Sequence, residues 1–429
     1  MANRSSRRPV AGDRVRVAGG GDETRWTMRL RDSESDARFR KEVRAWLAEN
    51  SPALGPPPPY RDWPAKKAYD QRWQRMLFDA GYAGIDWPAA YGGRGATASE
   101  QLIFLAESAA AGAPDLGVHF VGQLHAGPTL IAEATDAQRA FHLPKILRGE
   151  SIWCQGFSEP GAGSDLAALR TRAVRDGDHY VVNGSKIWTS YGFAADYCEL
   201  LVRTDPDAGK HRGISWLIMP MDTPGIDVRP LRTIQGESEF AEMFLDDVRI
   251  PVENLVGREN DGWRVAMVTF SFERGTALVR ELLTAMTMVE ELAALAKTLG
   301  HGARGTAWDD DAIRREIGQV AAELDAMWAL TRRNVTRAAG GGGVPPAGGS
   351  AFKLTYSEAL HHFGEVALKV LERYAVSLDD LALPGGATLP AGRHLLEHLH
   401  AFAISIGAGT SQIQKNILAE RVLGLPRER

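Results

Sequence analysis

The chain has 429 residues, of which 44% are hydrophobic and 24% charged, a composition typical of a soluble globular protein with two or three domains. Its formal net charge of −4 argues against a nucleic-acid-binding surface, which would carry a basic excess. Its two cysteines, Cys154 and Cys198, provide no disulfide framework and no metal-ligand spacing, and no apolar run reaches the roughly 18 residues of a membrane span, so we expect a cytoplasmic protein without a metal site.

Residues 1–34 are expected to form a flexible N-terminal extension. Arginines recur among its glycines, namely Arg4, Arg7, Arg8, Arg14 and Arg16. A start rich in Arg and Ser is typical of a transit peptide, but no amphipathic helix can be traced in it, which favours a disordered tail.

Residues 35–152 show the period of α-helices. The first apolar stripe, from residue 36 to 48, stops before Asn50-Ser51-Pro52, and comprises Phe39, Val43, Trp46 and Leu47. Further helices are predicted over 63–80, 99–111 and 130–147, with a Gly- and Pro-bearing loop over 85–95. We therefore predict an N-terminal α-helical domain over residues 35–152.

The period changes in residues 153–260, where short β-rich runs alternate with Gly, Pro and Asp turns. These runs are 172–182, 196–202, 213–219, 226–231 and 242–248. Strands that follow one another without intervening helices favour an antiparallel sheet or barrel. This segment is the predicted middle β domain.

Helical spacing returns in residues 261–429. One very long helix is predicted over 262–299, and a second from Asp311, whose apolar stripe is Ile313, Ile317, Val320, Leu324 and Trp328. Two more are predicted over 353–371 and 392–423. Such helices pack as a four-helix bundle, and such bundles often form oligomers. The predicted fold class is therefore α+β multidomain: N-terminal all-α domain, middle antiparallel β-sheet or barrel domain, and C-terminal four-helix bundle.

The segment 153–190 is the strongest candidate for a ligand site. Its first half combines hydroxyls with closely spaced glycines, so backbone N–H groups can approach a ligand. Its second half presents one large aromatic ring, Trp188, beside the hydroxyls of Thr189 and Ser190. The spacing matches neither G-x-G-x-x-G nor a P-loop, so an ordinary junction between helix and sheet remains an equal alternative.

Several motifs, in this order, resemble the acyl-CoA dehydrogenase family of flavoproteins from residue 36 to 427. They are Phe157-Ser158-Glu159-Pro160-Gly161-Ala162-Gly163-Ser164-Asp165, Lys186-Ile187-Trp188-Thr189-Ser190, the runs 239–248 and 262–267, Phe270-Ser271-Phe272-Glu273-Arg274, and Gly407-Ala408-Gly409-Thr410-Ser411-Gln412. The resemblance implies FAD as cofactor, acyl-CoA as substrate and an electron-transfer flavoprotein as electron acceptor. In the family's reaction, a proton leaves the carbon α to the thioester while the β carbon gives a hydride to the flavin. So weak a carbon acid needs a carboxylate base placed by geometry, and donors at the thioester oxygen.

The family places that base at one of two positions. One immediately precedes the Gly-Thr of the last motif, and here it is Ala408, which cannot act as a base. The other precedes an arginine in the first long C-terminal helix, and here it is Glu273, followed by Arg274. A Glu-Arg pair on a helix is commonly a solvated ion pair, but the resemblance and the nearby Phe270 and Phe272 favour Glu273 as the catalytic base. An apolar site would raise its pKa towards neutrality.

The resemblance also implies the cofactor and substrate contacts. The residues implied at the flavin ring are Phe157, Ser158, Gly163, Ser164, Trp188, Thr189 and Ser190. Arg314 is implied at the FAD pyrophosphate of a neighbouring subunit, and Thr410 and Gln412 at its adenosine half. Ser164, Arg274 and Gly409 are implied at the substrate.

Three of these residues have plainer alternatives or limits. Trp188 could be core packing, and Arg274 could form a structural salt bridge. Glu159, the conspicuous acid of the first motif, stands before Pro160 in a rigid turn, and is expected to be scaffolding. Because Arg314, Thr410 and Gln412 require a second subunit, we expect a dimer or homotetramer.

Two departures from the family pattern point to bacterial relatives that act on varied acyl groups, including branched, steroid-side-chain and biosynthetic acyl thioesters. Ala241 stands where relatives commonly have Asn, and the stretch 365–374 lacks a Gly-Gly pattern. Two alternatives to the dehydrogenase stay open. The chain could be a non-catalytic or half-site subunit of a heteromer, or an acyl-CoA oxidase or monooxygenase that uses O₂.

Overall fold

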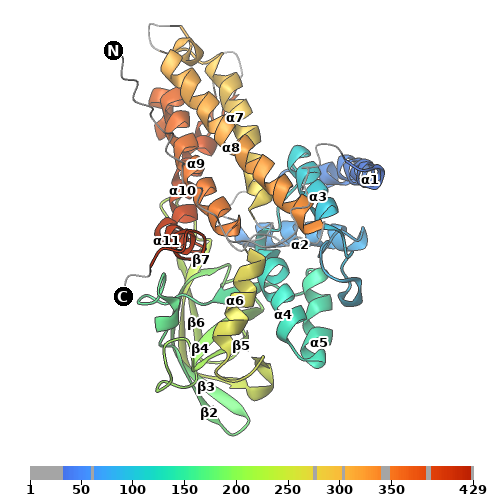
Figure 1. The fold of residues 1–429 in the computed structure, drawn as a ribbon, viewed down its shortest axis with the longest axis vertical. Coiled ribbons are helices and arrows are strands. Elements are labelled where there is room, and N and C mark those ends of the chain that lie inside the picture. Colours follow the sequence, from blue (N-terminus) through green and yellow to red (C-terminus); the bar gives the residue numbers. More distant parts are fainter. Residues whose placement is uncertain are drawn as a thin grey trace, which may run out of the picture.

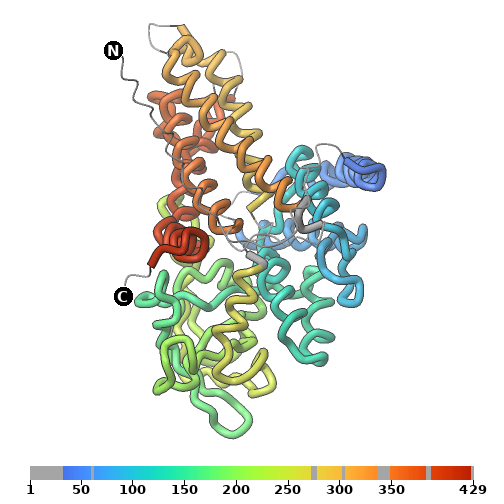
Figure 2. The backbone as a smooth tube through the Cα atoms, viewed as in Figure 1, coloured from blue at the N-terminus to red at the C-terminus, as the bar shows by residue number. Residues whose placement is uncertain are grey.

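The computed structural model describes residues 32–58, 62–273, 278–301, 305–339, 348–382 and 388–426. Most of the predicted N-terminal extension, residues 1–31, and the predicted substrate residue Arg274 lie outside these ranges. Figures 1 and 2 show an N-terminal helical part and a β-sheet side by side, with a long helical bundle extending away from both. The predicted order of helical, sheet and helical parts is confirmed.

The N-terminal part is helical, as predicted. Its α-helices are α1 (Glu34–Asn50), α2 (Trp63–Asp79), α3 (Ala98–Ala110), α4 (Gly127–Glu133) and α5 (Asp136–Leu147). The single helix predicted over 130–147 is wrong, because Thr135 begins a new helix. Its hydroxyl accepts a hydrogen bond from the Gln138 N–H, and the Gln138 side-chain oxygen accepts one from the Thr135 N–H. This reciprocal pair is a capping box. A π-helical turn, Gly122–Ala126, stands directly before α4.

The middle part is an eight-stranded sheet in the order β6-β7-β3-β2-β4-β5-β8, with β1 also paired to β4. The strands are β1 (Trp153–Gly156), β2 (Arg172–Asp176), β3 (His179–Ser190), β4 (Tyr197–Arg203), β5 (Ile214–Pro220), β6 (Ile226–Leu231), β7 (Phe240–Pro251) and β8 (Leu255–Val256). Most neighbours are antiparallel, as predicted, while β1 and β2 each pair with β4 in parallel. The run predicted over 172–182 is a hairpin that turns at Gly177, whose φ of 61° suits glycine.

The C-terminal part contains α6 (Gly262–Glu273), α7 (Val279–Ala296), α8 (Asp311–Ala339), α9 (Gly348–Leu371), α10 (Ala391–Ile406) and α11 (Ser411–Arg421), with a small β9 (Leu381–Ala382) and β10 (Thr388–Leu389) pair. Helices α7 to α10 supply the core of the bundle. Within the described ranges, no helix is long and apolar enough to cross a membrane.

Two predicted helices of this part are wrong as single elements. The helix predicted over 262–299 is divided, because Leu278 has non-helical backbone angles and α7 begins after it. The helix predicted over 392–423 is interrupted at 407–410. There Ala408 and Gly409 have φ of 53° and 84°, and the Thr410 side chain caps α11.

Helix α6 lies apart from the bundle, between the sheet and helices α4 and α5 (Figure 1). Its Val265 and Ala266 are buried in a core shared with the N-terminal helices and with one face of the sheet, which contributes Leu201 and Trp216. The other face of the sheet has its own core around Val182 and Leu200. Because one continuous core joins Val265, Ala266 and Phe270 of α6 to the N-terminal helices and to the sheet, this part of α6 is fixed relative to both.

Candidate functional site

The predicted ligand segment is built on a buried ion pair. The Lys186 side chain is fully buried on β3, and its Nζ donates to the Phe157 carbonyl at 3.1 Å and to Glu159 Oε1 at 2.8 Å. Glu159 also accepts from the backbone N–H groups of Arg170 and Thr171, at 2.7 and 2.8 Å. These contacts fix the turn that follows Phe157, so Glu159 holds the segment in place, as expected from the sequence.

The surroundings of Glu159 keep it ionised. Burial on its own would raise the pKa of Glu159, but the Lys186 ammonium and the donors from Thr171 and Arg170 outweigh it and lower the pKa below its ordinary range. Burial lowers the pKa of Lys186, and the Glu159 carboxylate opposes that change. A carboxylate held by three donors is unsuited to remove a proton from a carbon acid near neutral pH.

The structure brings the two halves of the segment together. The Ile187 N–H donates to the Ser158 carbonyl at 3.0 Å, so the start of the Gly-rich loop lies against the Lys186–Ser190 end of β3. Thr189 is fully buried and Ser190 is half-buried. Their backbones pair with Ala241 and Phe240 of β7.

Trp188 is presented outward rather than packed into the core. The β3–β7 register shifts between Lys186 and Thr189, and Trp188 has a φ of 63°. A left-handed conformation costs a bulky residue roughly 1–2 kcal/mol, and such strain persists only where surrounding structure enforces it. The side chain is 58% exposed, and its ring meets the edge of Phe240, at 6.0 Å between centroids. The core-packing alternative for Trp188 is therefore wrong.

The Gly-rich loop is open on its outer side. Gly163 and Ser164 are exposed, and a Cβ added at Gly161 or Gly163 would meet no atom within 4 Å. The protein's own packing does not require glycine there. Small residues at these positions instead leave free space beside the loop, which a ligand can occupy.

Helix α6 carries the predicted base towards this segment. The ring of Phe270 meets Phe157 edge to face, with centroids 5.8 Å apart. One turn of helix further on, α6 ends at Glu273. The predicted base thus stands on the helix whose Phe270 packs against Phe157.

The residues predicted at the far half of the cofactor make local contacts, Arg314 at the start of α8 and the others around the start of α11. Arg314, in the first turn of α8, donates to the Trp308 carbonyl at 2.5 Å and pairs with Asp311. Thr410 accepts from the Ile413 N–H at 3.2 Å at the start of α11, and Gln412 is exposed. Gly409 has a φ of 84°, and its carbonyl accepts from Gln414 Nε2 at 3.3 Å. None of these hydrogen bonds reaches the Phe157–Trp188 region.

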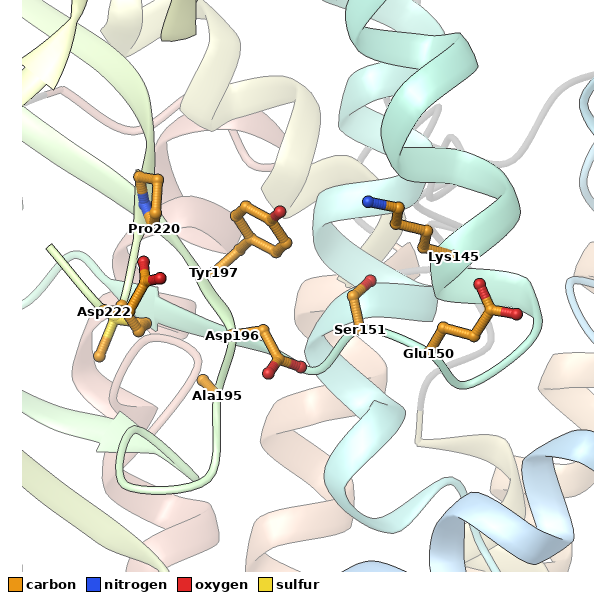
Figure 3. Close-up of a pocket in the computed structure, with 9 residues that line it drawn as sticks. Lys145, Glu150, Ser151, Ala195, Asp196, Tyr197, Pro220 and Asp222 are labelled. Carbon is orange, nitrogen blue, oxygen red and sulfur yellow. The ribbon is translucent and has the colours of Figure 1, made fainter.

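A cavity of about 480 Å³ lies elsewhere, between α5 and the adjacent ends of β4 and β5 (Figure 3). Lys145 enters it from α5, and Asp196, Tyr197 and Asp222 from the sheet side. None of the predicted site residues lines it. One ammonium facing several carboxylates gives it no resemblance to a flavin-binding surface. Groups of three or more metal-ligating side chains are also absent from the described part of the chain.

Sequence reasoning missed two features of the site. The first is Lys186, whose ammonium anchors the Phe157 carbonyl. The second is a buried polar cluster of His125, Gln155 and Glu199 beneath β1. Its one sequence signal is a glutamate inside the apolar run Cys198-Glu199-Leu200-Leu201, which is rare for a buried strand.

Comparison with known proteins covers nearly the whole described chain. Three family models match: "Acyl-CoA dehydrogenase, N-terminal domain" over residues 33–150, the corresponding middle domain over 154–248, and the C-terminal domain over 260–423. The chain is 38% identical over 400 residues to the acyl-CoA dehydrogenase IpdE1 of Mycobacterium tuberculosis, covering 91% of this chain and 98% of that protein. It is 36% identical to the acyl-CoA dehydrogenase FadE26 of the same organism, over 93% of this chain and 99% of that one.

Two solved structures are similar over nearly the whole chain. One is titled "Tcur3481-Tcur3483 steroid ACAD", with a TM-score of 0.78 and 31% identity, and covers 94% of this chain and 100% of that one. The other is the ChsE4-ChsE5 complex from Mycobacterium tuberculosis, with a TM-score of 0.78, 34% identity and the same two coverages.

Proposed function

The chain belongs to the acyl-CoA dehydrogenase family of FAD-dependent oxidoreductases, and on that premise we propose that it converts an acyl-CoA thioester to the 2-enoyl-CoA with Glu273 as the base. The observation that carries the proposal is the packing of α6 on the Phe157–Ser158 stretch. That packing supports the proposal because it brings the helix that bears Glu273 against Phe157, at the start of the Gly-rich loop.

The residues present fit a flavin. Trp188 offers an exposed ring on a strained backbone, and the loop around Gly163 leaves open space beside backbone groups. Phe157, Ser158, Gly163, Ser164, Trp188, Thr189 and Ser190 would hold the isoalloxazine end. Arg314, Thr410 and Gln412 of a second subunit would hold the pyrophosphate and adenosine. When bound, FAD supplies the hydride acceptor.

The remaining steps belong to the chain's own residues. Glu273 takes the proton from the carbon α to the thioester, and that proton ends on its carboxylate as the α,β double bond forms. Ser164, Arg274 and Gly409 bind the thioester arm, and donors at the thioester oxygen stabilise the charge that develops there. Lys186 and Glu159 touch no substrate in this scheme; they keep the Phe157 carbonyl and the following turn fixed.

The proposal also covers the kind of acyl group and the protein partners. One similar structure is named as a steroid ACAD and another as a two-protein complex, which supports testing steroid-side-chain thioesters and a heteromeric partner. We propose an oligomer, with an electron-transfer flavoprotein as electron acceptor, and domains over 35–152, 153–260 and 261–429.

The test examines the colour of the purified protein and then the bleaching of its flavin by substrates. The purified protein is expected to be yellow, and one member of a panel of straight, branched and steroid-side-chain acyl-CoAs should bleach the flavin under anaerobic conditions. A colourless chain that acquires FAD only with a second protein would support the half-site alternative. Consumption of O₂ during turnover, unaffected by electron-transfer flavoprotein, would support an oxidase.

A second prediction concerns Trp188. Trp188→Ala should leave the melting temperature of the FAD-free protein nearly unchanged, because the side chain is 58% exposed. Loss of a stacking partner worth about 0.5–1.5 kcal/mol should raise the dissociation constant of FAD roughly 2- to 12-fold, measured by flavin fluorescence. Phe141→Ala, at another aromatic residue that is 50% exposed, is the matched control. An FAD affinity equal to that of the control would remove Trp188 from the flavin site.

A further inference from the structure

Three polar side chains meet in the core beneath β1. Gln155 Nε2 donates to Glu199 Oε1 at 2.8 Å and lies 3.3 Å from His125 Nδ1. His125 Nδ1 lies 3.6 Å from the same Glu199 oxygen. Glu199 is fully buried, and only 3% of the surface of His125 is exposed. We call these residues the His125–Gln155–Glu199 cluster.

The cluster joins three elements at a junction between the N-terminal helices and the sheet. His125 comes from the π-helical turn Gly122–Ala126, Gln155 from β1 and Glu199 from β4, where Gln155 and Glu199 are register partners. Two residues after Gln155 the chain reaches Phe157 and Ser158. Short π-helical turns inside helices are frequently found at functional sites.

Stability alone is a weak reason for this arrangement. Burying a carboxylate costs several kcal/mol even when it is well paired, and apolar replacements of whole buried polar groups are often neutral or stabilising. Strand β1 has four residues and pairs with β4. A polar cluster near its end adds hydrogen bonds, which fix the direction of the strand. Apolar packing alone restrains that direction less.

The same N-terminal segment also reaches the helix of the proposed base. The hydroxyls of Thr129 on α4 and Thr269 on α6 lie 2.9 Å apart and are both buried. Thr269 is one turn before Glu273 on α6. Residues 122–129 thus contact both the strand that leads into the Phe157–Ser158 stretch and the helix that ends at the base.

We propose that His125 is a positioning residue that, through Gln155 and Glu199, fixes the Phe157–Ser158 stretch relative to the end of α6. The inference rests on the proposed function, since it assumes that this stretch and Glu273 serve one reaction. Proton and hydride removal require close alignment, and a misplacement of about 1 Å can cost 10²-fold in rate. Loss of the cluster should therefore lower the rate of flavin reduction more than it lowers the affinity for FAD or substrate.

The test compares His125→Leu with His125→Gln and with Gln138→Leu in the FAD-bound protein. Gln138 is the matched control, because its buried side chain ties α5 to the carbonyls of Glu253 and Leu255, at the same domain junction but away from β1. The readouts are the FAD dissociation constant, the flavin absorbance spectrum without substrate, the melting temperature, and the anaerobic rate of flavin reduction with its apparent substrate dissociation constant.

For His125→Leu we expect an altered flavin spectrum and a reduction rate lower by about tenfold or more, with FAD and substrate affinities within a few-fold of wild type. His125→Gln should recover most of the reduction rate. Gln138→Leu should keep the wild-type reduction rate even if its melting temperature is as low as that of His125→Leu.

Equal reduction rates in His125→Leu and Gln138→Leu would overturn the inference. If His125→Leu does not fold, the isosteric Glu199→Gln should show the same spectral change, and an unchanged spectrum and rate there would also overturn it. Wild-type protein that binds no flavin or is reduced by no acyl-CoA would refute the proposed function itself.

Discussion

Glu273→Gln is expected to retain a yellow FAD complex and to lose flavin reduction. A positioned general base contributes about 10²- to 10⁴-fold, so the rate of anaerobic bleaching by the best acyl-CoA should fall by that factor. The amide keeps the volume of the side chain and cannot accept the α proton. Stopped-flow absorbance of the flavin measures the rate, and a substrate-induced spectral change separates binding from chemistry. Glu290→Gln, at an exposed position on α7, is the control and should bleach normally.

Glu281, at the start of α7, is a second carboxylate whose variant tests the assignment of the base. Burial, with a smaller contribution from Asp115, raises the pKa of Glu281 to about 7, against the opposing effects of its own backbone hydrogen bond and Arg280. Glu281 is nevertheless exposed to solvent. A base with a raised pKa loses activity as the pH falls through that value. Bleaching that survives Glu273→Gln but vanishes in Glu281→Gln would transfer the catalytic role to Glu281.

The sequence pattern predicted the order of the domains well because each domain has one dominant period. Two predicted helix boundaries were wrong because a local cap or turn divides a segment that was predicted as one helix. The Thr135 capping box divides α4 from α5, and the left-handed backbone of Ala408 and Gly409 divides α10 from α11. The capping box leaves the spacing of apolar residues unchanged, whereas residues 407–412 contain no large apolar side chain and interrupt that spacing.

Candidate site residues could be predicted where they lie in one continuous segment of the sequence. Contacts between residues far apart in the sequence could not. The resemblance placed Phe157, Ser158 and Trp188 in one segment, and the structure joins its two halves through the Ser158 carbonyl. The exposure of Trp188 follows from a register shift between β3 and β7, which single residues do not encode. The His125–Gln155–Glu199 cluster brings together residues 30 and 44 positions from Gln155, and apart from Glu199 within its apolar run no local pattern indicates it.

Lys186→Met is expected to destabilise the FAD-free protein strongly. Removing one member of a buried ion pair costs about 3–5 kcal/mol, because the remaining charge is left uncompensated. Here the Glu159 carboxylate would keep the Arg170 and Thr171 donors, and the Phe157 carbonyl would lose its Nζ donor. Urea unfolding followed by tryptophan fluorescence measures the loss. Glu159→Gln/Lys186→Met is the matched variant: its amide still accepts a backbone N–H without charge, so we expect it to recover much of the stability.

The pH dependence of that loss distinguishes electrostatics from packing. In the wild type the pKa of Glu159 is lowered from 4.5, so its contribution to stability is present above that value and is lost as the pH falls through the folded pKa. In Lys186→Met, burial without an ammonium should raise the pKa of Glu159, so the carboxyl becomes neutral in the folded protein at a higher pH, and its penalty disappears as the pH falls. The difference in unfolding free energy between wild type and Lys186→Met should therefore narrow from pH 7 towards about pH 4. The difference between wild type and Glu159→Gln/Lys186→Met should change only by the contribution that ionised Glu159 makes to the stability of the wild type. A gap for Lys186→Met that stays constant over this range would mean that Lys186 acts through its methylene packing and that its charge is unimportant.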